Sequence, residues 1–127
     1  MNKKRPVNLD LTTIKFPITA IVSILHRLSG VILFLLIPLV IWMLHTSLAS
    51  PLGFKQIGIY MQNPIMKIVI WGLLAGYFYH LLAGIRHLFM DLQFAETLQG
   101  GKATAWLVIL VALILIVLTG LWLWFEI

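Results

Sequence analysis

His80 is the residue whose type and surroundings are most typical of a chemical site. It lies in an uncharged apolar segment, residues 68–85, where a charged side chain is costly but a neutral imidazole can bind a metal. Gly84, His87 and Asp91 follow it at helical spacing and share its face. Because Gly84 leaves room for a flat group, this is an arrangement expected beside a porphyrin. The alternative is a histidine that only hydrogen-bonds a neighbouring helix.

A second polar group precedes the first long apolar run. Ser23, Arg27 and Gly30 share one helix face, so polar groups from two helices are predicted to converge at one level. The Arg27 guanidinium could pair with a propionate or, together with the Ser23 hydroxyl, polarise a quinone carbonyl. Alternatively, Arg27 is a snorkelling anchor and Ser23 bonds its own backbone.

The sequence lacks the residue patterns of several other kinds of chemistry. It contains no cysteine, which excludes disulfides, thiolate metal sites and iron–sulfur ligation by this chain. Paired acid–base hydrolysis is not expected, because no two carboxylates share an apolar segment. No phosphate-binding loop, dinucleotide-binding glycine motif or zinc-protease motif is present.

The composition is that of an integral membrane protein. Of 127 residues, 61% are hydrophobic and 10% are charged, and the mean hydropathy is +1.04. Three apolar segments are long enough to cross a hydrocarbon core of roughly 30 Å as helices. We therefore predict an all-α membrane protein, a single anchor domain over residues 1–127 with transmembrane helices at 23–47, 66–91 and 103–125.

The segments outside the spans are short. Residues 1–22 are predicted to form an arm at the membrane surface. The following apolar run starts too late and is too long for a cleaved signal peptide. The two linkers, residues 47–63 and 91–102, contain glycines and are predicted to be short turns.

The basic side chains indicate the orientation of the spans. Seven lie on the side of the N-terminus and two on the other side. Because positive charge is retained in the cytoplasm, we expect a cytoplasmic N-terminus and, after three spans, a periplasmic C-terminus. This distribution explains the net charge of +5, so no nucleic-acid partner is expected. The seven are Lys3, Lys4, Arg5, Lys15, Arg27, Arg86 and Lys102, and the two are Lys55 and Lys67.

Two motifs resemble the cytochrome b556 family, the larger membrane anchor subunits of succinate dehydrogenase. The first comprises Arg5-Pro6, Ser23, His26-Arg27 and Ser29-Gly30, and the second comprises His80, Gly84-Ile85-Arg86-His87, Met90 and Asp91. The segments RPVNLDL and FPITAI are similar to those of proteobacterial members. One departure is Gln93, where the family commonly has a small residue, and it bears only on the packing of the loop.

The resemblance implies a set of cofactors, substrates and partners. His80 would be one axial ligand of haem b, and the other would come from a second small anchor subunit. Ser23 and Arg27 would bind ubiquinone, and His26 and Arg27 would lie near the haem propionates. The further partners are an iron–sulfur subunit and a flavoprotein subunit at the bacterial inner membrane. The chain would pass electrons from the iron–sulfur subunit to ubiquinone in the tricarboxylic acid cycle and respiratory chain, with no catalytic activity of its own.

Two other functions are compatible with the same residues. The anchor of a quinol:fumarate reductase would carry out the electron transfer in reverse. A haem-free structural anchor or small transporter would use His80 and Arg27 only to bond neighbouring helices. A haem spectrum separates this last function from the other two. The resemblance assigns no specific role to Arg86, His87 or Asp91.

Overall fold

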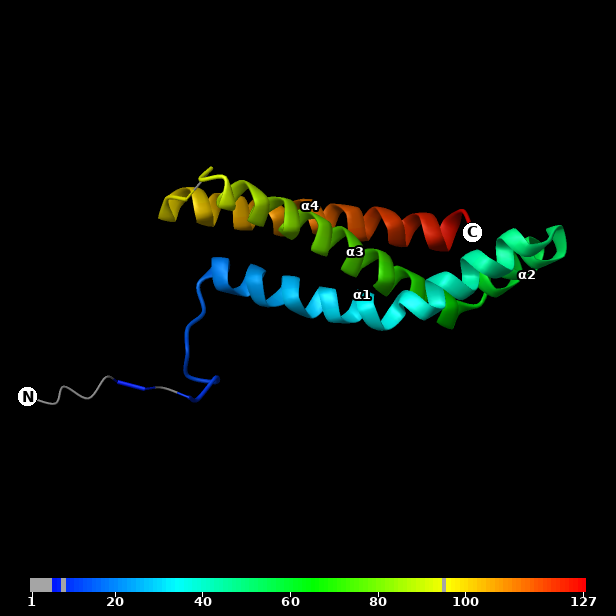
Figure 1. Ribbon diagram of the computed structural model, residues 1–127, viewed down its shortest axis with the longest axis horizontal. Helices are drawn as coiled ribbons and strands as arrows, with labels where there is room; N and C mark the ends of the chain where they lie inside the picture. Colours follow the sequence, from blue (N-terminus) through cyan, green and yellow to red (C-terminus); the bar gives the residue numbers. More distant parts are fainter. Residues whose placement is uncertain (1–5, 8, 95) are drawn as a thin grey trace, which may run out of the picture.

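The described residues form four α-helices, of which three are long and pack together (Figure 1). The computed structural model describes residues 6–7, 9–94 and 96–127. The three helices α1, α3 and α4 are long and apolar enough to cross a membrane, which confirms the predicted all-α class and the three predicted spans. The helices are α1 (Ile18–Ala49), α2 (Pro51–Met61), α3 (Pro64–Asp91) and α4 (Leu98–Phe125).

All three long helices begin earlier than predicted, and α3 begins at Pro64 rather than at residue 66. Helix α1 starts at Ile18, directly after Pro17, rather than at residue 23. Helix α4 starts at Leu98 rather than at residue 103, because the Thr97 side chain accepts a hydrogen bond from the Gly100 N–H and caps the first turn. The glycines that were predicted to form a turn therefore lie inside α4. The described arm is correspondingly shorter, and Lys3, Lys4 and Arg5 lie outside the described residues.

The first linker was wrongly predicted to be a short turn, because it contains the helix α2. Ser50 caps this helix by accepting a hydrogen bond from the Gly53 N–H at 3.0 Å, and Pro51 occupies its first position. Gly53 is required for close packing, since an added Cβ would overlap the backbone oxygen of Thr46 in α1. The glycine that indicated a turn thus serves a helix–helix contact.

The turn after α3 is closed by a Schellman motif. The Gln93 N–H donates to the Met90 oxygen at 3.0 Å, and the Phe94 N–H donates to the Phe89 oxygen at 2.9 Å. The rings of Phe89 and Phe94 also meet edge to face, with centroids 6.3 Å apart. Gln93 has a φ of 66°, the left-handed conformation that glycine adopts at least cost.

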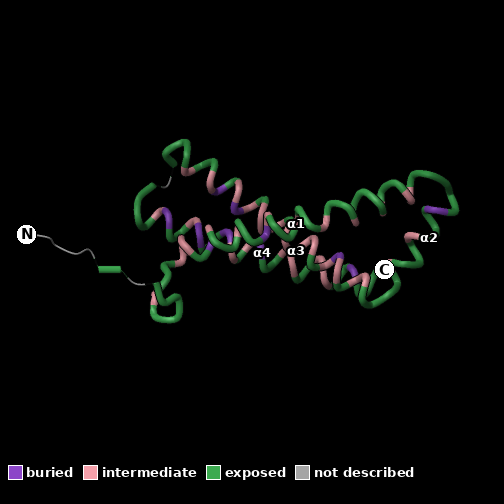
Figure 2. Tube along the Cα trace, turned by 60° about the horizontal axis from the view of Figure 1, so that its bottom comes forward, coloured by how far each residue is buried: buried purple, intermediate pink, exposed green. Residues whose placement is uncertain are grey.

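Most of the surface of the long helices is uncovered (Figure 2). The buried cluster is small and consists of Val22, Ala83, Ala105 and Val108, whose short side chains let the backbones approach closely. Large aliphatic and aromatic side chains cover the exposed faces. This distribution suits a lipid or subunit environment rather than water.

The described part of the arm and the C-terminal end of α4 lie at opposite ends of the bundle (Figure 1). The arm lies at the end where α1 begins and α3 passes to α4, whereas the C-terminus of α4 lies at the other end.

Within the arm, the Asp10 carboxylate accepts hydrogen bonds from the Thr12 hydroxyl and N–H at 2.7 and 3.0 Å. These bonds hold the pKa of Asp10 below its ordinary value.

Candidate functional site

His80 is held against α1 through one nitrogen of its ring. Its Nδ1 lies 3.0 Å from the Oγ of Ser29 and 3.1 Å from the backbone oxygen of His26. Ser29 is buried, while His80 is half-buried. Polar groups of the two helices therefore meet at one level, but on α1 they are Ser29 and the His26 backbone rather than Ser23 and Arg27.

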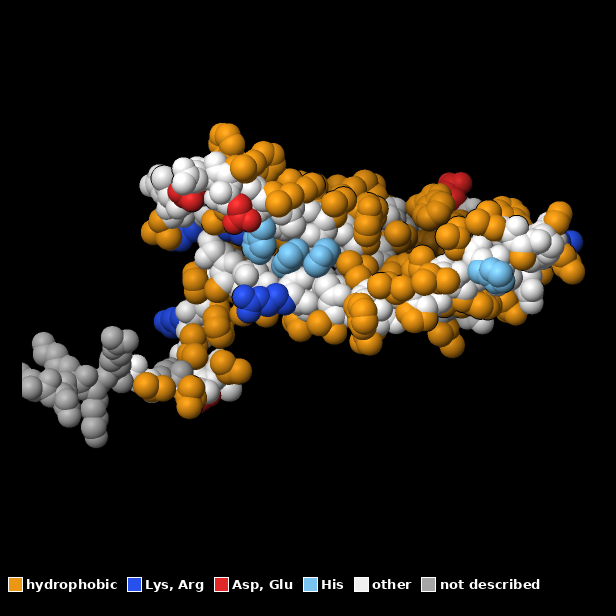
Figure 3. Space-filling view, in the orientation of Figure 1, with side chains coloured by type: hydrophobic (Ala, Val, Ile, Leu, Met, Phe, Trp, Pro, Cys, Tyr) orange, Lys and Arg blue, Asp and Glu red, His pale blue; other side chains and the backbone are white. Residues whose placement is uncertain are grey.

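Three imidazoles form a cluster across α1 and α3. His26 stacks on His80 with ring centroids 4.2 Å apart, and His87 meets His26 edge-on at 4.8 Å. Figure 3 shows histidine side chains gathered between α1 and α3, near the end where α1 begins, with basic and acidic side chains on either side. The helical spacing predicted that His87 shares a face of α3 with His80. It did not predict that the ring of His26 would lie against both.

Two glycines make room for these rings. A Cβ on Gly30 would lie 3.1 Å from His80 Cε1, which is closer than nearly all real contacts, and a Cβ on Gly84 would lie 3.5 Å from His26 Nε2. Gly84 was expected to leave space for a flat group, and the neighbour nearest to it is the His26 ring. Gly30 has less free space around it than Gly84. From the sequence, Gly30 was predicted only to share a helix face with Ser23 and Arg27.

Ser23 lies in an open groove between the start of α1 and the end of α3. The groove encloses about 500 Å³ and includes acidic, basic and hydroxyl side chains. Ser23 is half-buried there. The structure thus brings Ser23 together with the second predicted motif. The lining residues are Thr19, Ala20, Ser23, Arg86, His87, Met90 and Asp91.

Arg27 lies one turn beyond Ser23 on α1 and does not line this groove. Its side chain is exposed, and it makes no hydrogen bond or ion pair with the residues that the structure describes. The guanidinium is therefore available to a group outside the described chain. Its position is compatible with either of the predicted partners, a propionate or a quinone.

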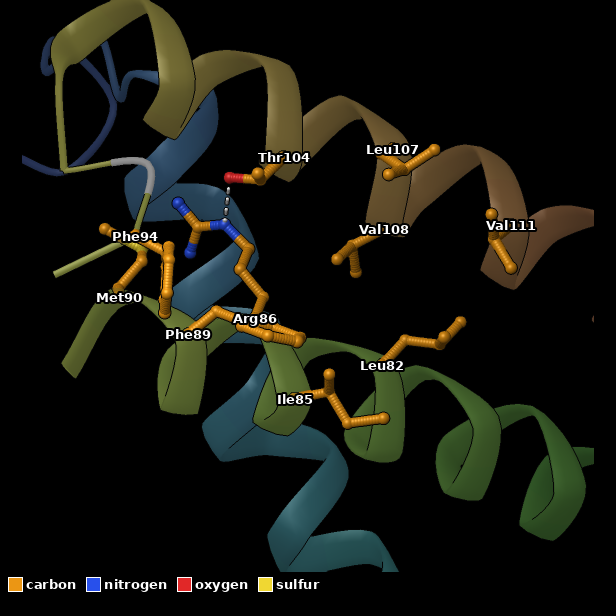
Figure 4. Close-up of a pocket in the computed structure, with 10 residues that line it drawn as sticks. All are labelled: Leu82, Ile85, Arg86, Phe89, Met90, Phe94, Thr104, Leu107, Val108 and Val111. Atoms are coloured by element: carbon orange, nitrogen blue, oxygen red, sulfur yellow. Dashed lines mark hydrogen bonds between the residues drawn. The ribbon is translucent and has the colours of Figure 1, made fainter. Parts of the chain in front are cut away.

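Arg86 joins α3 to α4 through two hydrogen bonds. Its Nε donates to Thr104 Oγ1 at 3.1 Å (Figure 4). Its Nη2 donates to the Gly101 oxygen at 3.2 Å. Only 5% of the residue is exposed. Thr104 could not be predicted as its partner from the sequence, because the position of Thr104 opposite Arg86 depends on how α4 is rotated about its axis.

A second pocket lies beyond Arg86 between α3 and α4 (Figure 4). Its volume is about 330 Å³. Aliphatic and aromatic side chains from both helices, such as Leu82, Phe89 and Val108, point into it. Most of its lining side chains are aliphatic or aromatic, so the pocket suits an apolar group.

The free nitrogen of His80 fits the haem iron that the resemblance implies. No described residue hydrogen-bonds Nε2, and the described residues contain no buried side-chain polar atom without a partner, so Nε2 reaches the surface of the chain. An imidazole held through Nδ1 with Nε2 accessible is the usual state of an axial histidine. No group of three or more possible metal ligands occurs among the described residues, but an axial site needs only one ligand from this chain.

Comparison with known proteins finds relatives that match nearly the whole chain. Residues 1–119 match the family described as "Succinate dehydrogenase/Fumarate reductase transmembrane subunit". The chain is 47% identical over 125 residues to the succinate dehydrogenase cytochrome b556 subunit of Coxiella burnetii, which covers 98% of this chain and 100% of that protein. The subunit of the same name from Rickettsia felis is 34% identical, covering 91% and 90% of the two chains. That of Paracoccus denitrificans is 31% identical, covering 91% and 88%.

Proposed function

Because this chain belongs to the transmembrane-subunit family of succinate dehydrogenases and fumarate reductases, we propose that it is the haem-binding anchor of a succinate dehydrogenase. The family and the three long apolar helices confirm a membrane protein of bacterial type. One observation carries the haem proposal: His80 is fixed through Nδ1 while Nε2 stays accessible. The relatives' name, cytochrome b556 subunit, denotes a haem protein and supports the same proposal.

His80 supplies one axial ligand, and a second small anchor subunit supplies the other. His26 would not supply the other ligand, because its ring stacks on that of His80 with an angle of 12° between the planes. His26 and Arg27 instead offer donors to the propionates. When bound, haem b supplies a one-electron redox centre.

Ser23 and Arg27 hold the quinone. The Ser23 hydroxyl donates a hydrogen bond to one quinone carbonyl, and the Arg27 guanidinium polarises it as negative charge develops. The quinone takes two electrons from the iron–sulfur subunit and two protons from the cytoplasm, and it leaves as the quinol. The open groove at Ser23 and the exposed, unpaired guanidinium of Arg27 support this assignment.

The N-terminus faces the cytoplasm, and the C-terminus faces the periplasm across the inner membrane. The arm and the ends of α1, α3 and α4 that carry Arg27, Arg86 and Lys102 lie at one end of the bundle, which supports this orientation (Figure 1). The iron–sulfur and flavoprotein subunits dock at that end. We propose succinate oxidation rather than fumarate reduction, because the relatives described above are all named as succinate dehydrogenase subunits.

A reduced-minus-oxidised absorbance spectrum of the native detergent-purified complex tests the proposal. The wild type is expected to show a b-type α-band that His80→Ala removes or alters. His45→Ala is the matched control, because His45 is an exposed histidine on α1 outside the imidazole cluster, and it should leave the band unchanged. Absence of the band in the wild type would contradict haem binding, and an unaltered band in His80→Ala would contradict the ligand assignment.

A further inference from the structure

Three groups with limited hydrogen-bonding capacity meet where α1 contacts α3. The Ser29 hydroxyl bonds the His26 backbone oxygen at 2.7 Å, within its own helix. His80 Nδ1 lies within 3.1 Å of both Ser29 Oγ and that same backbone oxygen. The three atoms therefore form a closed triangle of short contacts.

The protons in this triangle have only one consistent arrangement. A backbone oxygen can only accept, and a serine hydroxyl has a single proton to donate. Because that proton goes to the His26 oxygen, the serine oxygen can only accept from His80. Two acceptors thus face Nδ1, and Nδ1 must carry a proton. In the neutral imidazole the lone pair then lies on Nε2.

We propose that Ser29 is a positioning residue, which acts together with the His26 backbone oxygen to fix the tautomer and the direction of the His80 ring, so that Nε2 is presented as a metal ligand. This inference rests on the haem-binding function proposed above. Ser29 does not contact the metal and acts only through His80. An acceptor on the second nitrogen also makes the imidazole a stronger donor to the metal.

Burial makes this contact specific. Ser29 is only 5% exposed, so water does not readily replace its hydroxyl. Gly30 adds a steric constraint on the same helix, because the His80 ring occupies the space next to its Cα. The His80 ring is therefore held against α1 by its hydrogen bond to Ser29 and by its contact with Gly30.

Ser29→Ala in the native complex is the test. Loss of the hydroxyl should weaken electron donation by His80 to the ferric iron, which raises the haem midpoint potential. It should also speed haem transfer to excess apomyoglobin about tenfold, the lower end of the range for such partners, because the His26 oxygen still accepts from Nδ1. Ser47→Ala is the matched control. Ser47 makes the same backbone hydrogen bond on α1, to the Leu44 oxygen at 2.9 Å, but it makes no hydrogen bond to a described histidine.

Both readouts separate a positioning role from a general loss of stability. An unchanged potential and transfer rate in Ser29→Ala, or an equal change in Ser47→Ala, would overturn the inference. If Ser29→Ala does not yield complex, Ser29→Cys retains a weaker acceptor and should give a smaller shift in the same direction, while no shift would overturn the inference. A wild type without a haem band overturns the haem proposal itself, which distinguishes the two failures.

Discussion

The imidazole rings of His26 and His80 stack 4.2 Å apart, with an angle of only 12° between their planes. The same His26 also presents its backbone oxygen to His80 Nδ1 at 3.1 Å. One residue of α1 therefore contacts the proposed ligand on α3 through both its side chain and its backbone. Because of this double contact, the placement of the ligand depends on the register between α1 and α3.

Ser23→Ala and Arg27→Ala are each expected to lower quinone reduction by the assembled complex about tenfold or more, because each removes a hydrogen-bond donor to a carbonyl that gains negative charge. Succinate oxidation with an artificial acceptor should be unchanged, since that reaction bypasses the quinone. The two activities are measured on the same preparation of complex.

Lys102→Ala is the control for this pair of variants, because Lys102 is an exposed cation at the same end of the bundle. It should retain both activities. An equal loss of both activities in the Ser23 or Arg27 variant would contradict quinone binding and indicate failed assembly instead.

The spans were predictable because a membrane imposes simple requirements on them. A spanning helix must be long, apolar and internally hydrogen-bonded, and each of these properties follows from the local sequence. Helix α2 was not predicted, because Gly53 and Gly58 resemble turn residues in sequence. The reason for Gly53 becomes visible only when Thr46 of α1 lies against it.

In the candidate site, the positions of residues along one helix were predictable, but their partners on other helices were not. Spacing along one helix placed His80, Gly84 and His87 on one face, and the structure retains that face. The partners across helices, such as Ser29 for His80 or Thr104 for Arg86, depend on how each helix is rotated about its axis. Spacing within one helix does not determine that rotation.

Gln93→Gly is expected to stabilise the turn between α3 and α4 by about 1 kcal/mol, because glutamine pays a steric cost in the left-handed conformation that glycine avoids. The apparent melting temperature of the detergent-solubilised complex should therefore rise.

Gln62→Gly is the matched control, and it is expected to have the opposite effect on the melting temperature. Gln62 also ends a helix, but its φ is −78°, which suits any residue. Glycine there gains nothing in the folded state and adds freedom to the unfolded chain, so the melting temperature should fall. A fall in both variants would contradict the strain at Gln93.

Gly53→Ala is expected to loosen α2 from α1. The added methyl group would overlap the Thr46 backbone oxygen, and overpacking of this kind costs about 1–3 kcal/mol. Because trypsin cuts only locally unfolded chain, cleavage after Lys55, which lies within α2, should become faster in membranes that expose this side.

Gly58→Ala is the matched variant in the same helix. No atom lies within 4 Å of the site of its added Cβ, so alanine meets no obstacle there and raises helix propensity by about 1 kcal/mol. Cleavage after Lys55 should then be slower than in the wild type. The two glycine substitutions thus act in opposite directions although their chemistry is identical. Equal acceleration in both would show that the contact with Thr46 does not hold α2 in place.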